Sequence, residues 1–463
     1  MAKLFSGLIE NCYDSHVHWL GTGQFASRIR LHELRNPERD LPLLSISPTQ
    51  KNRPWLVGFG WDQNLFMDDD SAGAANKKFP THETLDRYFA DKPVYFLRID
   101  GHAAWVNRRA LELAGLWRKN PEVPAGGAIL LKADGYPTGV VLDHALQLFE
   151  KLLPKASAIQ VKADLLEAQN IFLRAGFTHI RDMSCDDLQW AAACELEAQG
   201  QLNLAVEQFF SADDPITFDE QLRKAVAHRA ERAHTPQALL QVAGVKVYLD
   251  GALGSEGAWL SQAYQTSQSS ALANAANFGL QLLTPEALQD FIEKAWLKEM
   301  PIAIHTIGDE AAHCAVTSAL KIREQKGLNG VLHLEHAELL RPETIALMPR
   351  LKVTCHMQPC HFLSDRRWLK EKLGPLARHA FQWRALEQSS VNIAMGSDSP
   401  IEPPSLQRNI DAVALAADEG LLAPQTSISK CHAHPNHQWA PKTRTRFEDG
   451  AAAEVWFRGD KII

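Results

Sequence analysis

From about residue 176 onward, short apolar runs alternate with longer segments in which apolar residues recur at helical spacing. This alternation is typical of βα units that build a parallel sheet. The first of eight predicted strands comes much earlier, over Leu8–His16, and the others cover Phe177–Arg181, Leu204–Phe210, Val242–Leu249, Pro301–His305, Val331–His336, Lys352–Met357 and Val391–Gly396. The helices predicted between them include Ala158–Ala175, Phe218–Ala233, Pro285–Glu299, Ala311–Gln325 and Pro342–Met348. Eight such units predict an α/β fold of the (β/α)8 TIM-barrel type.

Two regions fall outside this count. Residues 51–155 are rich in Gly, Pro and Asp turn signals and contain one further strand-like run, Val94–Ile99, so we expect an inserted α+β subdomain there. Residues 421–463 are polar and carry several His and Pro before a last short strand, Ala453–Phe457. The predicted barrel therefore covers 1–50 and 156–420, and 421–463 form a separate C-terminal segment.

Polar residues at the ends of the predicted strands are the candidate metal-binding or catalytic residues. Asp14-Ser15-His16-Val17-His18 places two imidazoles on one side of the first strand. A chain with 19 histidines is expected to contain about one such pair by chance, and His432 with His434 is a second one in loop-like sequence. Context separates the two, because apolar Leu8 and Ile9 precede the first pair, whereas Pro435 and Pro441 mark the second as loop. Active sites of TIM barrels lie at the C-terminal strand ends, so the ends of the other predicted strands are candidate sites as well.

Other predicted strands end in metal-ligand types as well, namely His305, His336 and Asp398. Each has a structural alternative, since a lone histidine is often a hydrogen-bonded core residue and an aspartate after a strand often caps a turn. His333 is expected to point to the face opposite His336 because of its odd offset. The coincidence of these residue types at one end of one barrel favours a metal site.

Lys246 lies inside the apolar run Val245–Leu249, where a solvated lysine is least expected. Burial lowers the pKa of a lysine and so frees its neutral amine, which can add carbon dioxide to become a carbamate. That anion has two oxygens and can bridge two cations. The alternative is a lysine whose stem is buried and whose ammonium reaches the barrel mouth.

Composition narrows the class of protein. A net charge of -7 shows no excess of basic residues, so nucleic acid is not an expected partner. No apolar run approaches the ~20 residues of a membrane span, and no secretory signal is recognisable, so we expect a cytoplasmic protein without membrane attachment. The seven cysteines are scattered without a Cys-x-x-Cys pair, which leaves nitrogen and oxygen as the ligands of any metal.

Taken together, the chain resembles the amidohydrolase superfamily, and within it the YtcJ-like (amidohydrolase 3) hydrolases related to N-substituted formamide deformylase. The resembling segments are Tyr13–Gly21 (YDSHVHWLG), Gly58–Phe66 (GFGWDQNLF), Arg98–Asn107 (RIDGHAAWVN), Gly244–Ala258 (GVKVYLDGALGSEGA), His305–Ala311 (HTIGDEA), Leu334–Leu340 (LEHAELL), Gln358–His361 (QPCH) and Gly396–Pro403 (GSDSPIEP).

The resemblance implies a binuclear metal centre. One ion would be held by His16 and His18 and the other by His305 and His336, with Lys246 as the bridging carbamate and Asp398 as the last ligand and the general base, then acid. Zinc suits these ligands best, and iron, manganese and nickel are alternatives. Implied substrate-binding residues are Trp61, Asp62, His102, Trp105, Asn107 and His361.

The implied function is hydrolysis of a C–N bond in a small amide, formamide or cyclic amide by a metal-bridging hydroxide. One alternative is a mononuclear deaminase of a nitrogen heterocycle, with Glu310 following His305, and another is a catalytically silent barrel used for binding. One departure stands out: only 15 residues precede His16, so the small β-sandwich of related proteins is expected to be reduced, or completed by a second subunit in a homodimer.

Overall fold

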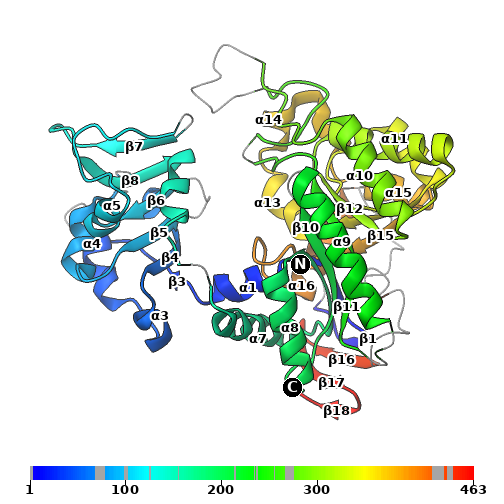
Figure 1. Ribbon diagram of the computed structural model, residues 1–463, viewed down its shortest axis with the longest axis horizontal. Helices are drawn as coiled ribbons and strands as arrows, with labels where there is room; N and C mark the ends of the chain where they lie inside the picture. The colour runs from blue at the N-terminus through cyan, green and yellow to red at the C-terminus, as the bar shows by residue number, and fades with distance from the viewer. Residues whose placement is uncertain are drawn as a thin grey trace. The chain divides into compact units, whose positions relative to one another are not determined.

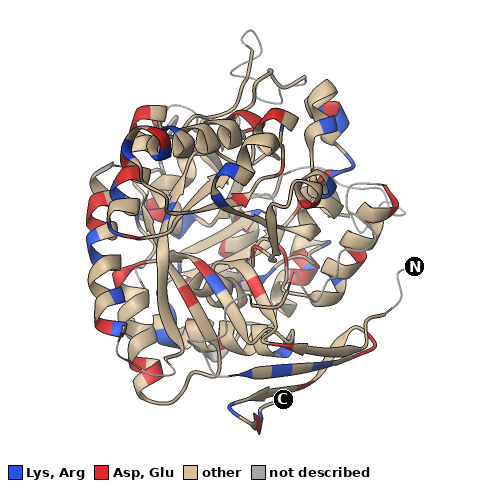
Figure 2. Ribbon diagram, turned by 90° about the vertical axis from the view of Figure 1, so that its right-hand side faces the viewer, with Lys and Arg blue, Asp and Glu red and all other residues tan. Residues whose placement is uncertain are grey.

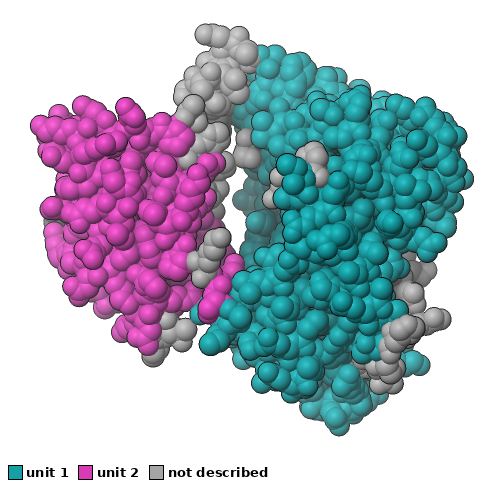
Figure 3. All heavy atoms as spheres, in the orientation of Figure 1, with its two compact units in different colours: residues 1–23, 158–463 teal, residues 24–157 magenta. Residues whose placement is uncertain are grey.

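The computed structural model describes residues 4–67, 79–98, 103–124, 127–154, 156–212, 215–233, 235, 238–254, 256–265, 276–419, 432–434 and 442–463. The chain folds into two compact units, residues 1–23 with 158–463 and residues 24–157 (Figure 3). None of the described helices is both long and apolar enough to cross a membrane.

The larger unit contains a sheet of eight parallel strands, which confirms the TIM-type barrel. Its strands are β2 (Tyr13–Val17), β9 (His179–Cys185), β10 (Ala205–Ala212), β11 (Leu240–Tyr248), β12 (Ile302–Thr306), β13 (Val331–His336), β14 (Lys352–Met357) and β15 (Asn392–Met395). They pair in chain order from β2 to β15. A parallel bridge between Val17 and Ser399 joins the first strand to the loop after the last, and so closes the barrel.

Helices follow most of these strands and cover the outside of the barrel (Figure 1). They are α7 (Ala158–Arg174), α8 (Asp187–Ala198), α9 (Pro215–Arg232), α10 (Pro285–Leu297), α11 (Asp309–Lys326), α12 (Pro342–Leu347), α13 (Pro359–Asp365), α14 (Leu369–Leu373), α15 (Trp383–Gln388) and α16 (Leu406–Asp418). All five helices predicted from periodicity are present, with ends that differ by a few residues. Met183, Phe209 and Ala303 form a buried cluster inside the unit.

The predicted first strand is in fact two strands in different sheets. Asn11 has a positive φ of 48°, a backbone conformation that asparagine tolerates better than most residues. Before this turn, β1 (Gly7–Glu10) pairs with β16 (Thr443–Glu448), and after it β2 enters the barrel. The prediction of one continuous strand over Leu8–His16 was therefore wrong.

Strands β1, β16, β17 (Ala451–Phe457) and β18 (Asp460–Lys461) form a four-stranded antiparallel sheet. Along β16, buried Thr443, Thr445 and Phe447 alternate with more exposed Arg444 and Arg446. Figure 2 shows both basic and acidic residues on the strands of this sheet. This sheet is the additional β-structure expected from the C-terminal segment, and it also takes in the N-terminal strand.

The smaller unit is built on a mixed six-stranded sheet, in the order β3-β4-β5-β6-β8-β7. The strands are β3 (Ile29–Arg30), β4 (Leu56–Trp61), β5 (Val94–Arg98), β6 (Ala103–Val106), β7 (Gly127–Leu131) and β8 (Pro137–Asp143), with helices α2 (Pro37–Asp40), α3 (Pro48–Asn52), α4 (His82–Phe89), α5 (Arg108–Leu113) and α6 (Gln147–Glu150). Helix α1 (Trp19–Ala26) spans the division between the units. Because β3 pairs with β4, residues 24–50 belong to this unit, whereas the sequence placed them in the barrel.

Candidate metal centre

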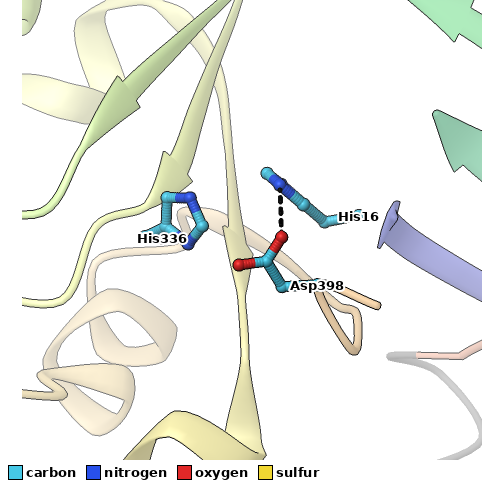
Figure 4. Close-up of side chains that lie close together, drawn as sticks. All are labelled: His16, His336 and Asp398. Atoms are coloured by element: carbon cyan, nitrogen blue, oxygen red, sulfur yellow. Dashed lines mark ion pairs between the residues drawn. The ribbon is translucent and has the colours of Figure 1, made fainter. Parts of the chain in front are cut away.

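His16 and His18, at the end of β2, converge on Asp398. The Nε2 atoms of the two histidines lie 3.3 and 3.2 Å from Oδ1 of Asp398. The backbone N–H of Asp398 donates to the carbonyl of His16 at 2.8 Å, and Oδ1 of Asp14 accepts from the N–H of Ser397 at 2.8 Å. These bonds hold the loop after β15 against β2, so barrel closure itself brings the carboxylate to the imidazoles. Figure 4 shows the ion pair between Asp398 and His16, with His336 beside them.

His305 and His336 complete the histidine cluster. Their ring centroids are 4.5 Å apart, and that of His336 is 4.7 Å from that of His16. One ligand atom each from His16, His336 and Asp398 lies within 4.8 Å of the others. Nδ1 of His336 is 2.9 Å from Oε1 of Gln358, which leaves Nε2 of His336 as the nitrogen available to a metal.

The backbone at the end of β13 explains how His336 reaches this cluster. His336 has a φ of 68°, in the left-handed region, so the alternation of side chains along the strand stops there. Earlier in the strand, the ring of His333 lies 5.7 Å from that of Phe209 and its Nδ1 lies 3.0 Å from Nε2 of His356. His333 is therefore directed at Phe209 and His356 and is only partly buried.

Lys246 is fully buried on β11, and its Nζ has no hydrogen-bond partner. Its nearest described aromatic contact is the ring of Tyr248, whose centroid is 4.5 Å from Nζ. Burial lowers the pKa of Lys246 to about 8, against the opposing charges of Glu335 and Asp398. A substantial fraction of the amine is therefore neutral near physiological pH.

The electrostatic environment keeps most of the candidate ligands in the protonation state that binds a metal. Burial and the neighbouring charge of Lys246 lower the pKa of His305 to about 3, and burial with His305 and His16 lowers that of His336 well below its usual value. Burial also opposes the carboxylate of Asp398, but His16, His18 and His336 outweigh it and hold the pKa of Asp398 well below normal. Neutral imidazoles and an ionised carboxylate are the forms that bind metal ions.

Four donor atoms of this cluster are buried without any hydrogen-bond partner, namely Nε2 of His16, Nζ of Lys246, Nε2 of His305 and Oδ1 of Asp398. Leaving such atoms unsatisfied is costly, and native structures rarely do so without an ion or a functional reason. The donor set of nitrogen and oxygen therefore fits a divalent cation.

Comparison with known proteins identifies the family. Residues 13–420 match the model of the amidohydrolase family. The chain belongs to this family. It is 30% identical over 413 residues to the putative amidohydrolase YtcJ of Bacillus subtilis, covering 87% of this chain and 71% of that protein. It is 24% identical over 328 residues to N-substituted formamide deformylase of Arthrobacter pascens, covering 69% of this chain and 58% of that protein.

Solved structures agree with this assignment. An uncharacterized metal-dependent hydrolase from Pyrococcus furiosus superposes with a TM-score of 0.68 at 25% identity, over 92% of this chain and 80% of that one. The protein is therefore a hydrolase of the amidohydrolase family, acting in general on carbon–nitrogen bonds other than peptide bonds, and the family implies a divalent metal.

The structure assigns packing roles in the smaller unit to three predicted substrate-binding residues of this amidohydrolase. Trp61 and Trp105 are fully buried and donate their indole N–H to the carbonyls of Phe96 and Thr81. Asn107 accepts from the N–H of Ala110 and caps α5. Substrate binding by these three residues, and by Asp62 in the same unit, stays a prediction, and His102 lies outside the described residues.

His361, the remaining predicted substrate-binding residue, does lie beside the metal cluster. Its Nε2 is 3.6 Å from Oδ2 of Asp398, and its Nδ1 is 2.9 Å from Oε1 of Glu338. The other Glu338 oxygen, Oε2, is buried without a hydrogen-bond partner. The approach of Glu338 was missed, because left-handed backbone at both His336 and Ala337 turns the chain back toward the site.

The sequence analysis also missed Arg181 and Glu335. Both are almost completely buried within barrel strands and joined by a 2.8 Å ion pair, and Glu335 contacts Nδ1 of His16 at 2.6 Å. A usable signal was present, because a charged residue inside a buried strand needs a partner. The same reasoning that singled out Lys246 applies to Arg181 and Glu335.

Proposed function

We propose that this amidohydrolase cleaves the C–N bond of a small amide, formamide or cyclic amide with an apolar substituent, using two divalent metal ions. The observation that carries the proposal is the set of buried, unpartnered donor atoms on His16, Lys246, His305 and Asp398. None of these atoms has a hydrogen-bond partner, although Nε2 of His16 lies 3.3 Å from Oδ1 of Asp398, and bound cations would satisfy all four. The match to N-substituted formamide deformylase supports the same class of bond.

In this proposal His16 and His18 hold one ion, His305 and His336 hold the other, and Asp398 is the last ligand. Zinc is the favoured metal for nitrogen and oxygen donors, with iron, manganese and nickel as alternatives. When bound, such ions lower the pKa of a water molecule and polarise a substrate carbonyl.

Lys246 would serve as a bridging ligand after modification. Its neutral amine attacks carbon dioxide, a C–N bond forms, and one proton leaves to solvent, which gives a carbamate anion with two oxygens. Full burial among histidines and the lowered pKa of Lys246, about 8, favour the neutral amine needed for this reaction.

Asp398 would carry the protons of the reaction. Its low pKa keeps it ionised, so an oxygen of its carboxylate can accept a proton from the attacking water and later deliver it to the leaving nitrogen. Burial opposes a positive charge on His361, but Glu338 outweighs it and raises the pKa of His361 to about 9. Protonated His361 would then donate from Nε2 to a substrate oxygen next to Asp398.

The deaminase alternative gains no support from Glu310. Its carboxylate lies 3.1 Å from a guanidinium nitrogen of Arg341. The same residue lines a surface cavity of about 420 Å³ with His313 and Lys321. Glu310 is therefore engaged with Arg341, and it is absent from the potential metal-binding groups of the described residues.

The proposal is tested by loading the purified protein with zinc or manganese in bicarbonate buffer and screening N-formyl, N-acyl and cyclic amides. We expect two metal ions per chain by elemental analysis and release of an amine from at least one class. In Lys246→Ala we expect loss of at least one ion and of turnover, whereas Lys352→Ala, which changes an exposed lysine, keeps both.

Two results would count against the proposal. Retention of both ions by Lys246→Ala would rule out the carbamate bridge. Metal content well below one ion per chain, with no amide hydrolysed after zinc or manganese is added, would rule out the enzyme and favour a barrel that only binds.

A further inference from the structure

Three charged or polar side chains form a continuous chain across the barrel interior. The guanidinium Nη1 of Arg181, on β9, donates to Oε1 of Glu335 on β13 at 2.8 Å. The other oxygen of Glu335 lies 2.6 Å from Nδ1 of His16 on β2. The relative exposure of these residues is 1%, 0% and 0%, so water does not compete for the contacts.

Further contacts hold Arg181 in place. Its guanidinium lies 4.0 Å from the ring centroid of Phe209, and its Nη1 also approaches the carbonyl of Ser15 at 3.3 Å. A guanidinium can only donate hydrogen bonds. The Glu335 oxygen that faces Arg181 must therefore accept, whatever happens at the other oxygen.

We infer that Glu335 and Arg181 are positioning residues that fix the tautomer of His16. Both oxygens of the ionised carboxylate accept, so His16 carries a hydrogen on Nδ1, and Nε2 is the nitrogen left to face the ligand cluster. The inference rests on the metal centre proposed above for what Nε2 binds, whereas the hydrogen on Nδ1 is expected in the metal-free protein as well.

A single substitution separates this role from simple packing. In Glu335→Gln the amide has one oxygen and one NH2, and Arg181 requires the oxygen. The NH2 group then faces His16, whose Nδ1 must accept, and the hydrogen moves to Nε2. The substitution preserves the size of the side chain but places a hydrogen on the nitrogen that should bind metal.

The double variant Arg181→Met/Glu335→Gln should reverse this effect. Without the guanidinium, the amide is free to turn its oxygen toward His16, and Nδ1 can donate again. In Glu335→Asp the carboxylate is kept on a shorter side chain, so its effect should be intermediate. Glu207→Gln is the matched control, because Glu207 is a barrel carboxylate that lies 3.2 Å from a different histidine, His434.

The first measurement is the affinity of metal-free protein for zinc, by chelator competition, with cobalt spectra to report the ligand field. We expect Glu335→Gln to bind the first ion about 10- to 100-fold more weakly, a typical effect of losing an outer partner of a metal-binding histidine. The double variant should recover part of that loss, and Glu207→Gln should bind like wild type.

The second measurement is the ¹⁵N chemical shift of His16 in histidine-labelled, metal-free protein, assigned with His16→Gln. We expect Nδ1 of His16 to carry a hydrogen in wild type, whether or not Nε2 beside Asp398 also carries one, and to carry none in Glu335→Gln. Wild-type affinity in Glu335→Gln, equal weakening in Glu207→Gln, or a hydrogen retained on Nδ1 in Glu335→Gln would overturn the inference. If wild type binds no metal, the proposed function fails, while the protonation of Nδ1 of His16 still decides the positioning role.

Discussion

Lys246 should make the metal-free barrel less stable than a variant without the charge. Its side chain is fully buried and its Nζ has no hydrogen-bond partner. An ammonium in such a place has lost its hydration without gaining an equivalent partner. We therefore predict that Lys246→Met abolishes the bridging ligand but stabilises the metal-free protein.

The magnitude follows from the pKa of Lys246, which falls from 10.5 to about 8 in the folded chain, mainly through burial. At about 1.36 kcal/mol for each tenfold change in acidity, the charged amine costs the folded state about 3 kcal/mol. For a barrel unit of roughly 330 residues this corresponds to about 5 °C in Tm.

The sign of the pH dependence is also determined. Because the unfolded chain binds the proton more tightly, wild type gains stability as pH rises from about 8 to 10.5, and the variant does not. The advantage of Lys246→Met should thus be complete at pH 7 and largely gone by pH 10.5.

The assay is urea unfolding of chelator-treated protein at pH 7 and pH 10, with Lys352→Met as the control at an exposed lysine. Equal or lower stability of Lys246→Met at pH 7, or an advantage that does not shrink at pH 10, would refute the reasoning. Either result would mean that a buried, unpaired ammonium at this position does not destabilise the folded protein.

Three more predictions concern other parts of the barrel. Asp398→Asn should keep most of the metal but lower kcat by about 10²- to 10⁴-fold, as expected for a lost acid–base group; near-normal turnover would contradict its role. Asp250 accepts from the N–H groups of Ile307 and Gly308, just after His305. Asp250→Ala should therefore destabilise the fold by about 1–3 kcal/mol per orphaned donor, measured by unfolding. It should also weaken binding of the second metal ion, measured by elemental analysis. Burial opposes the charge of Glu207, but His434 outweighs it and lowers the pKa of Glu207 to about 2. His434→Asn should therefore be less stable than wild type at pH 6, and the difference should disappear as pH falls from 4.5 toward 2. A difference that stays constant in acid titrations would argue against the pair.

The second His-x-His pair shows how far a short motif can be interpreted. His432 and His434 match the spacing of His16 and His18, yet they lie at the start of β2, where Nδ1 of His432 is 3.0 Å from the carbonyl of Tyr13. Both pairs are largely buried. Their different positions follow from which end of the strand they occupy, whereas the sequence separated them by the apolar run before the first pair and the loop-like residues around the second.

The hydrophobic pattern predicted a strand less reliably than usual where the strand's pairing partner lies far away in the sequence. The apolar run at Leu8 and Ile9 predicts a strand but not its partner, and the partner is β16, more than 400 residues away. The same holds for residues 24–50, whose short strand β3 joins the smaller unit through β4. Pairing between distant strands depends on which edges remain free after the rest has folded, and periodicity carries no information about that.

The order of strands and helices and the candidate ligands His16, His18, Lys246, His305, His336 and Asp398 could be derived from the chain alone, because residue type and strand position are local properties. Their distances, the turn of His336 into the cluster and the chain from Arg181 through Glu335 to His16 depend on closure of the barrel. Closure brings side chains from β2, β9 and β13 together in one dry interior, where each buried charge must find its partner. The folded arrangement therefore determines which nitrogen of His16 is free to bind a metal.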